Sequence, residues 1–160
     1  MRMLWLDPGG TTGWALYQGG PFALMDHPER GIKLGQIGPH EHHLELKVHI
    51  ETEISRDFLL GYESFQYRQD QDRTTVSLVS CEYIGVVKLI KDERPDLAIA
   101  SQTPGEGVGG FFGKKQGGDE KIKKLGLWWP GHKHAMDALR HMLYYEVFTN
   151  GNKQILQALR

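Results

Sequence analysis

Five short segments of the chain carry apolar patterns typical of β-strands. Residues 3–6 form a continuous apolar run, and residues 14–17 form a second run after a glycine-rich turn, so the two predict a hairpin. Residues 31–38 alternate between apolar and polar side chains, as a third strand would. The runs at residues 58–63 and 97–100 predict the fourth and fifth strands.

Longer segments predict helices. One helix is expected over residues 74–94, ending before Pro95, and two more over residues 117–125 and 132–148. Residues 152–160 form a short, weakly amphipathic tail that we expect to be helical or frayed.

Residues 40–56 fit two patterns. A period of two, which favours a strand, joins Leu44, Leu46, Val48 and Ile50. A helical stripe joins Leu44, Val48 and Ile54. If strands 3–6 and 58–63 are parallel, the segment between them must be a crossover, which is usually a helix, so we expect a helix.

The helix predicted over residues 74–94 has two distinct faces. Its apolar stripe, suited to packing on a sheet, consists of Val76, Val79, Tyr83, Val87 and Ile90. A second face carries Leu78, Cys81, Gly85 and Leu89. This second face indicates either a deeply buried helix or a contact between two subunits.

The order of these elements predicts an α/β fold with a five-stranded mixed sheet, three antiparallel strands followed by parallel ones, flanked by helices. One domain over residues 1–160 suits the length. The single cysteine, Cys81, excludes an internal disulfide and multi-cysteine zinc motifs. No apolar run approaches the ~20 residues that cross a bilayer. We therefore expect a cytoplasmic protein that does not associate with membranes.

Acidic residues follow two of the predicted strands. Asp7 ends the first and Glu63 ends the fourth. If these strands are parallel neighbours, about 4.8 Å apart, both acids lie at the edge where open α/β sheets bind ligands. Each acid also has an ordinary explanation, since Asp7 suits a turn and Glu63 a solvated strand end.

The last long helix brings a further candidate pair. His134 and Asp137 are three residues apart and share one helix face. Asp137 is also favoured near a helix N-terminus without any function, and we expect His132 and His141 to lie on the surface. Three carboxylates in a small volume require cations or raised pKa values, and oxygen ligands contributed singly suit Mg²⁺ or Mn²⁺.

Three motifs taken together resemble those of a known family. Residues 6–15 (LDPGGTTGWA), 62–65 (YESF) and 134–139 (HAMDAL) are similar to the active-site motifs of RuvC-type Holliday-junction resolvases, particularly the compact bacteriophage versions. The resemblance covers nearly the whole chain. It implies an RNase H-like fold, a homodimer and Mg²⁺-dependent cleavage of branched DNA. The expected location is the cytoplasm, which would be that of the bacterial host if the protein comes from a phage.

The resemblance also implies roles for individual residues. It makes Asp7, Glu63, His134 and Asp137 the ligands of two metal ions that hydrolyse the phosphodiester, leaving a 5′-phosphate and a 3′-hydroxyl. Many relatives have aspartate where this chain has His134, and this softer ligand favours Mn²⁺ at least as much as Mg²⁺.

Two segments are candidates for contacts with DNA. Although the formal net charge is −1, lysines gather between residues 114 and 133, with Lys114, Lys115, Lys121 and Lys124 as the expected DNA-binding members. An ordinary solvated face is the alternative. After Glu63, we expect contacts with bases and phosphates from Phe65, Tyr67, Arg68 and Arg73, with burial of Phe65 in the core as the alternative.

Two-fold symmetry of a four-way junction favours a two-fold dimer. Its expected interface is the face with Leu78, Cys81, Gly85 and Leu89, where oxidation of Cys81 could link the subunits. Three other functions remain open: a phosphotransferase of the actin and sugar-kinase type, for which 160 residues leave no second domain; a non-catalytic nucleic-acid binder on the same fold; and a ribonuclease or flap endonuclease. Forks and flaps are possible substrates besides four-way junctions.

Overall fold

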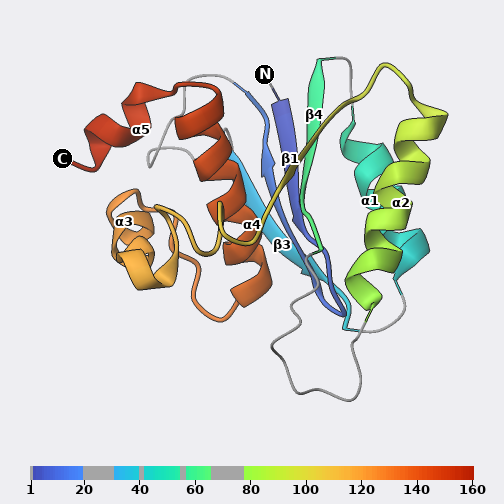
Figure 1. Cartoon of the computed structure of the whole chain (residues 1–160), viewed down its shortest axis with the longest axis horizontal. Coiled ribbons are helices and arrows are strands. Elements are labelled where there is room, and N and C mark those ends of the chain that lie inside the picture. The colour runs from blue at the N-terminus through green and yellow to red at the C-terminus, as the bar shows by residue number, and fades with distance from the viewer. Residues whose placement is uncertain (1, 20–30, 40–41, 55–56, 66–77) are drawn as a thin grey trace.

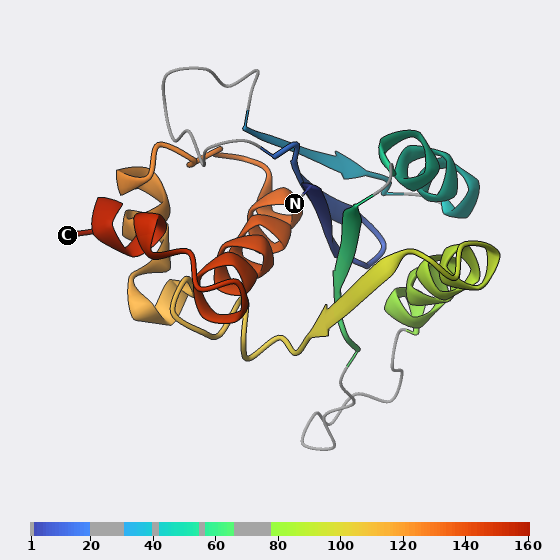
Figure 2. The ribbon, with the colours of Figure 1, turned by 90° about the horizontal axis from the view of Figure 1, so that it is seen from above.

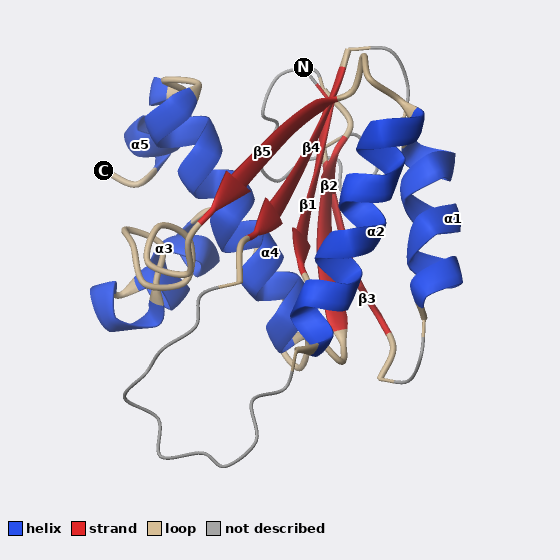
Figure 3. Ribbon diagram, turned by 45° about the vertical axis from the view of Figure 1, so that its right-hand side comes forward, coloured by secondary structure: helices blue, strands red, loops and turns tan. Residues whose placement is uncertain are grey.

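A five-stranded mixed sheet forms the centre of the molecule (Figures 1 and 3). The computed structural model describes residues 2–19, 31–39, 42–54, 57–65 and 78–160. The strands are β1 (Arg2–Asp7), β2 (Thr12–Tyr17), β3 (Ile32–Ile37), β4 (Phe58–Glu63) and β5 (Ala98–Gln102). Their spatial order is β3-β2-β1-β4-β5, with antiparallel pairing on the β2 side of β1 and parallel pairing on the β4 side. The predicted α/β sheet is confirmed.

Helices cover both faces of this sheet (Figures 1 and 2). One face carries α1 (His43–Glu53) and α2 (Val79–Glu93), the two crossovers into β4 and β5. The other face carries α4 (Lys133–Tyr144), which continues as the π-helical η2 (Tyr145–Thr149). Outside α4 lie the shorter elements η1 (Lys114–Gln116), α3 (Gly118–Lys124) and α5 (Lys153–Ala158). Within the described residues, no helix combines the length and apolar character needed to cross a membrane.

Alternation along the strands creates two separate cores. In β1, Met3 and Trp5 face α4, whereas Leu4 and Leu6 face α1 and α2, and all four side chains are buried. A strand buried on both faces has a continuous apolar run rather than an alternating one. Asp7 follows the same alternation and therefore projects to the α4 face.

Residues 43–53 form a helix, so the strand alternative for this segment is wrong. The predicted helical stripe is wrong for Leu44 and Val48, which are exposed, and right for Ile54, which is buried. The helix itself meets the sheet through Leu46 and Ile50. The buried pair is spaced i, i+4 like the predicted one, so spacing alone did not identify which face meets the sheet.

The α2 stripe is confirmed for its described members, since Tyr83, Val87 and Ile90 are buried and Val79 packs beside them. Val76 lies outside the described residues. The second face is solvent-exposed, so deep burial of α2 is excluded; exposed on it are Leu78, Cys81, Gly85 and Leu89.

Candidate active site at the carboxyl edge of the sheet

Polar side chains from three neighbouring parallel strands meet at one edge of the sheet. Asp7 ends β1, Glu63 ends β4 and Gln102 ends β5, where Glu63 and Gln102 are register partners. All three occupy positions that alternate onto the α4 face. The amino end of α4 lies at this same end of the sheet (Figure 1). The strands and this helix therefore converge on one small region.

Two residues bring the first turn of α4 against the sheet. A Cβ added to Gly13 would lie 2.0 Å from the carbonyl carbon and oxygen of His134, so the absence of a side chain lets the helix backbone touch β2. Gln36 of β3 supplies the second contact, because its Oε1 accepts hydrogen bonds from the backbone N–H groups of His134 (3.0 Å) and Ala135 (3.4 Å). These amides have no partner inside the helix, so Gln36 serves as its cap.

The approach of α4 places His134 on Asp7. His134 Nδ1 lies 2.9 Å from Asp7 Oδ2. Burial raises the pKa of the Asp7 carboxyl, and the charges of Glu63 and Asp137 raise it further, whereas the hydrogen bond with His134 acts in the opposite direction. The same hydrogen bond is the main cause of a raised pKa at His134. The three acids therefore share one electrostatic environment, and that environment favours an added positive charge.

Asp137 is held by a buried arginine. Arg140, whose side chain is 1% exposed, donates from Nη1 to Asp137 Oδ1 (2.5 Å), from Nη2 to Asp119 of α3, and from Nε to the Phe112 carbonyl (3.1 Å). Every arm of the guanidinium thus has an acceptor, which is the condition under which a buried charge is tolerated. Arg140 fixes the Asp137 carboxylate and ties α4 to α3.

Glu63 is held by a histidine that we expected on the surface. His141 is 0% exposed, and its Nε2 lies 2.6 Å from Glu63 Oε2. The expectation for His141 was wrong because this residue is seven after His134 and four after Asp137, on the same face of α4, which the sheet covers. That spacing is the sequence signal that could have identified its burial.

The donor set fits a divalent cation in its chemistry. Three carboxylates, two of which raise the pKa of the third, Asp7, are together with an imidazole ligands that Mg²⁺ or Mn²⁺ accepts. In the present arrangement, however, no three His, Cys, Asp or Glu side chains among the described residues form a group suited to one metal ion. Each acid instead has a hydrogen-bond partner of its own on α4: His134 for Asp7, His141 for Glu63 and Arg140 for Asp137.

The predicted DNA-binding lysines differ in their surroundings. Lys114 and Lys115 are exposed on η1. Lys121 donates to the carbonyls of Phe111 (2.7 Å) and Gln116 (2.9 Å), and burial lowers its pKa. Lys124 donates to the Leu159 carbonyl (2.8 Å). The ammonium groups of Lys121 and Lys124 are thus hydrogen-bonded to backbone carbonyls of the protein itself, which the sequence did not indicate.

Of the candidates that follow Glu63, only Phe65 is described. It is partly exposed, at 36%, so its burial in the core is excluded. The other three, Tyr67, Arg68 and Arg73, lie outside the described residues.

A hollow of about 260 Å³ lies beside the amino end of α4. Lys114 and Lys133 line it together with Trp129 and His132, whose rings stack at 4.0 Å, and with Arg140. Trp129 is 39% exposed. The hollow therefore combines two lysines with aromatic rings next to Arg140, the residue that holds Asp137, and the carboxylate of Asp119 also lines it.

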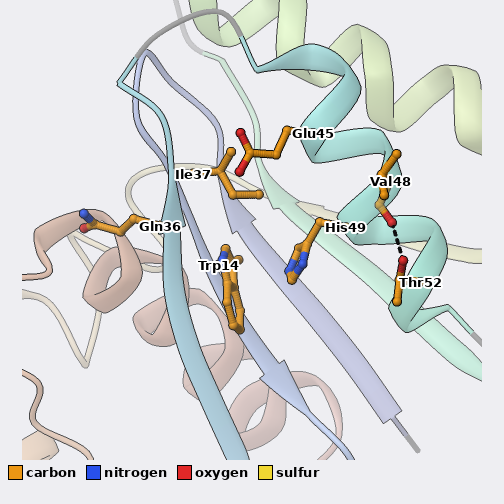
Figure 4. Close-up of a pocket in the computed structure, with 7 residues that line it drawn as sticks. All are labelled: Trp14, Gln36, Ile37, Glu45, Val48, His49 and Thr52. Atoms are coloured by element: carbon orange, nitrogen blue, oxygen red, sulfur yellow. Dashed lines mark hydrogen bonds between the residues drawn. The ribbon is translucent and has the colours of Figure 1, made fainter.

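A second hollow, of about 420 Å³, lies between α1 and the strands β2 and β3 (Figure 4). Trp14 and His49 line it with their rings 4.6 Å apart, and burial lowers the pKa of His49. Figure 4 shows Gln36 on the other side of β3 from His49. Since Trp14 packs with the α1-side core and Asp7 projects to the α4 face, the sheet separates this hollow from the acids.

The molecule is an α/β protein with acidic side chains at the carboxyl edge of its parallel strands. Comparisons with sequence models of protein families and with curated protein sequences find no match. The fold is similar to that of Thermus thermophilus RuvC in complex with a Holliday junction substrate, with a TM-score of 0.63 and 15% identity over 95% of this chain and 97% of that one. A second structure of T. thermophilus RuvC gives a TM-score of 0.54 and 16% identity over 93% and 97%. The predicted RNase H-like fold is confirmed.

Proposed function

We propose that this protein is a structure-selective endodeoxyribonuclease that resolves Holliday junctions and related branched DNA by metal-dependent hydrolysis. The observation that carries the proposal is the convergence of Asp7, Glu63 and Asp137 at the sheet edge, with Asp7 in contact with His134. The likeness in fold to RuvC, solved with a Holliday junction substrate and matched along almost the whole chain, supports the choice of substrate.

In this proposal, Asp7, Glu63, His134 and Asp137 hold two divalent cations. Bound there, the cations would activate a water molecule and stabilise the leaving 3′ oxygen, giving 5′-phosphate and 3′-hydroxyl ends. The chain's own part is to fix the ligands: β1 and β4 place Asp7 and Glu63, and Arg140 orients Asp137. Cation binding has to compete with the hydrogen bond between His134 and Asp7. Because His134 offers a nitrogen ligand, which is softer than a carboxylate, Mn²⁺ is expected to serve at least as well as Mg²⁺.

The DNA would approach the amino end of α4. Lys114 and Lys115 provide phosphate contacts, and the rings of Trp129 and His132 provide a surface on which an unpaired base can stack. Phe65 is exposed next to Glu63 and suits the same task. Contacts with DNA from Tyr67, Arg68 and Arg73 stay predictions. The same holds for DNA contacts from Lys121 and Lys124.

A junction requires two matched cuts, so we propose a homodimer. The exposed α2 face with Leu78, Cys81, Gly85 and Leu89 is the expected interface. In light-scattering measurements, Leu89→Glu should convert a dimer to a monomer. Oxidation should give a disulfide-linked band on non-reducing electrophoresis, and Cys81→Ser should lose it. A compact bacteriophage origin, and with it the cytoplasm of a bacterial host, also stays a prediction.

The decisive test is cleavage of a labelled four-way junction, a flap, a fork, a duplex and an RNA–DNA hybrid in Mg²⁺ or Mn²⁺. Asp7→Asn and Asp137→Asn should abolish cleavage of the junction while preserving its binding. Asp92→Asn, the same substitution at an exposed position of α2 across the sheet, is the matched control and should cleave normally. Junction cleavage by Asp7→Asn at the wild-type rate would refute the site.

The same experiment separates the alternatives. Preferred cleavage of the hybrid or the flap would identify a ribonuclease or a flap endonuclease. Junction binding without cleavage in either metal would identify a non-catalytic binder. Ligation of the nicked products without prior phosphorylation would confirm the proposed ends.

A further inference from the structure

The imidazole of His141 is enclosed on every side. Its ring lies parallel to that of Trp5, with an interplanar angle of 11° and centroids 6.0 Å apart. On the loop before α3, a Cβ on Gly107 would lie 2.3 Å from ring atoms of His141, so the loop backbone packs directly against the ring. Packing thus determines where the two ring nitrogens point.

Both nitrogens of this ring face polar side chains. Nε2 lies 2.6 Å from Glu63 Oε2, and Nδ1 lies 2.8 Å from the side-chain oxygen of Gln102. Gln102 is itself buried, and its amide nitrogen has no hydrogen-bond partner among the described residues. A buried amide nitrogen without an acceptor is costly.

Rotating the Gln102 amide by 180° gives this nitrogen a partner. The oxygen and nitrogen of a glutamine amide have nearly the same shape, so the rotated amide fits the same space. Its N–H then donates to His141 Nδ1, which leaves the proton of the ring on Nε2 for donation to Glu63. The Gln102 backbone is already fixed beside Glu63, because its carbonyl accepts from the Ser64 backbone N–H at 2.8 Å.

We propose that His141 is a positioning residue for Glu63, and that Gln102 fixes the imidazole tautomer that donates to this carboxylate. The donated hydrogen bond holds Glu63 Oε2 and leaves Oε1 available as a ligand. The role of Glu63 as a ligand rests on the proposed function, whereas the hydrogen-bonded chain from Gln102 through His141 to Glu63 does not. Partners of this kind behind a metal ligand affect metal affinity or activity by about 10–100-fold.

Two substitutions at one position separate hydrogen bonding from packing. His141→Leu fills the buried space without a donor, whereas His141→Gln supplies an amide N–H that can reach the place of Nε2. His43→Leu is the control for loss of a histidine, because His43 lies on α1 across the sheet with a surface ion pair to Glu82. Calorimetric titration with Mn²⁺ in the absence of DNA measures the affinity of the site for the ion, without requiring cleavage.

We expect His141→Leu to weaken Mn²⁺ binding by about 10–100-fold and to lower kcat with little change in KM. His141→Gln should recover most of both losses, and His43→Leu should match the wild type. Wild-type Mn²⁺ affinity in His141→Leu, equal losses in the Leu and Gln variants, or no Mn²⁺ binding by the wild type would each overturn the proposal.

A spectroscopic measurement covers the case in which His141→Leu does not fold. Long-range ¹H–¹⁵N spectra of the wild type should show His141 with its proton on Nε2, and Gln102→Leu should reduce the population of that tautomer. An unchanged tautomer in Gln102→Leu, or a wild-type proton on Nδ1 alone, would overturn the role of Gln102. If the wild type binds Mn²⁺ with the expected tautomer but cuts no DNA, the proposed nuclease function fails while this inference stands.

Discussion

Substitution of Gly13 by alanine tests how helix α4 is seated on the sheet. Gly13 pairs with Asp7 across β1 and β2, and the backbone of His134 lies directly above it. The new methyl group would lie 2.0 Å from the carbonyl of His134 and 2.5 Å from the nitrogen of Ala135. These atoms belong to the backbone of α4, so no side-chain rotation can relieve the overlap.

The size of the effect follows from these distances. Ordinary contact begins at 3.4 Å, so the first turn of α4 would have to move by about 1.4 Å. Overpacking of this kind costs about 1–3 kcal/mol, equivalent to a fall in Tm of roughly 2–12 °C for a domain of this size. A displacement of about 1 Å at a catalytic group costs about 10²-fold in rate. The same movement stretches the hydrogen bond between His134 and Asp7.

Thermal denaturation and junction cleavage in Mn²⁺ measure the two effects. Gly10→Ala is the matched control in the same turn, because a Cβ at Gly10 would meet no atom within 4 Å. We expect Gly10→Ala to keep the wild-type Tm and rate, and Gly13→Ala to lose both stability and cleavage. Identical behaviour of the two variants would refute the close seating of α4 on β2.

Three further predictions concern the contacts around the acids. Gln36→Ala should lower the free energy of unfolding by about 0.5–2 kcal/mol in urea denaturation, whereas Gln36→Glu, which keeps an acceptor for the helix amides, should not. Arg140→Met should cost about 3–5 kcal/mol in the same assay, because it leaves a buried carboxylate unpaired, and a loss below 1 kcal/mol would contradict the pairing. In metal-free protein, NMR titration should give His134 a pKa above 6.5 that falls in Asp7→Asn. A histidine whose pKa is raised on folding stabilises the folded state at pH values below its pKa in the unfolded chain, and this stabilisation is lost as the pH rises through its folded-state pKa. The wild type should therefore lose stability relative to Asp7→Asn above about pH 6.5.

The strands and their acids could be predicted from local patterns. Residues 3–6 are continuously apolar because β1 is central and buried on both faces, and the same run places Asp7 at its end. The parallel pairing of β1 with β4 then required a crossover helix, which corrected the misleading alternation of residues 44–50. The pattern within each segment was therefore sufficient to predict the strands and to place Asp7 and Glu63 at strand ends.

Contacts between distant elements could not be predicted in the same way. The partners of His141 are one example, because its ring packs against the loop at Gly107 and against Trp5, which are far from it in the chain. The cap from Gln36 joins residues about a hundred positions apart in the chain. Lys121 and Lys124 looked equivalent to Lys114, but their backbone acceptors come from the local fold of η1 and from the end of α5. Tertiary packing determines which hydrogen-bond and packing partners these side chains find.

The central position of β1 has a consequence for how the protein fluctuates. Strand β1 is bonded on both sides, to β2 and to β4, and residues 3–6 have no exposed surface. Amide hydrogens in such a strand exchange with solvent only when the whole domain opens, whereas those of a short surface turn such as η1 exchange through small local openings. Asp7 is thus attached to the part of the chain expected to exchange most slowly, whereas the amides of η1, which carries Lys114 and Lys115, are expected to exchange faster.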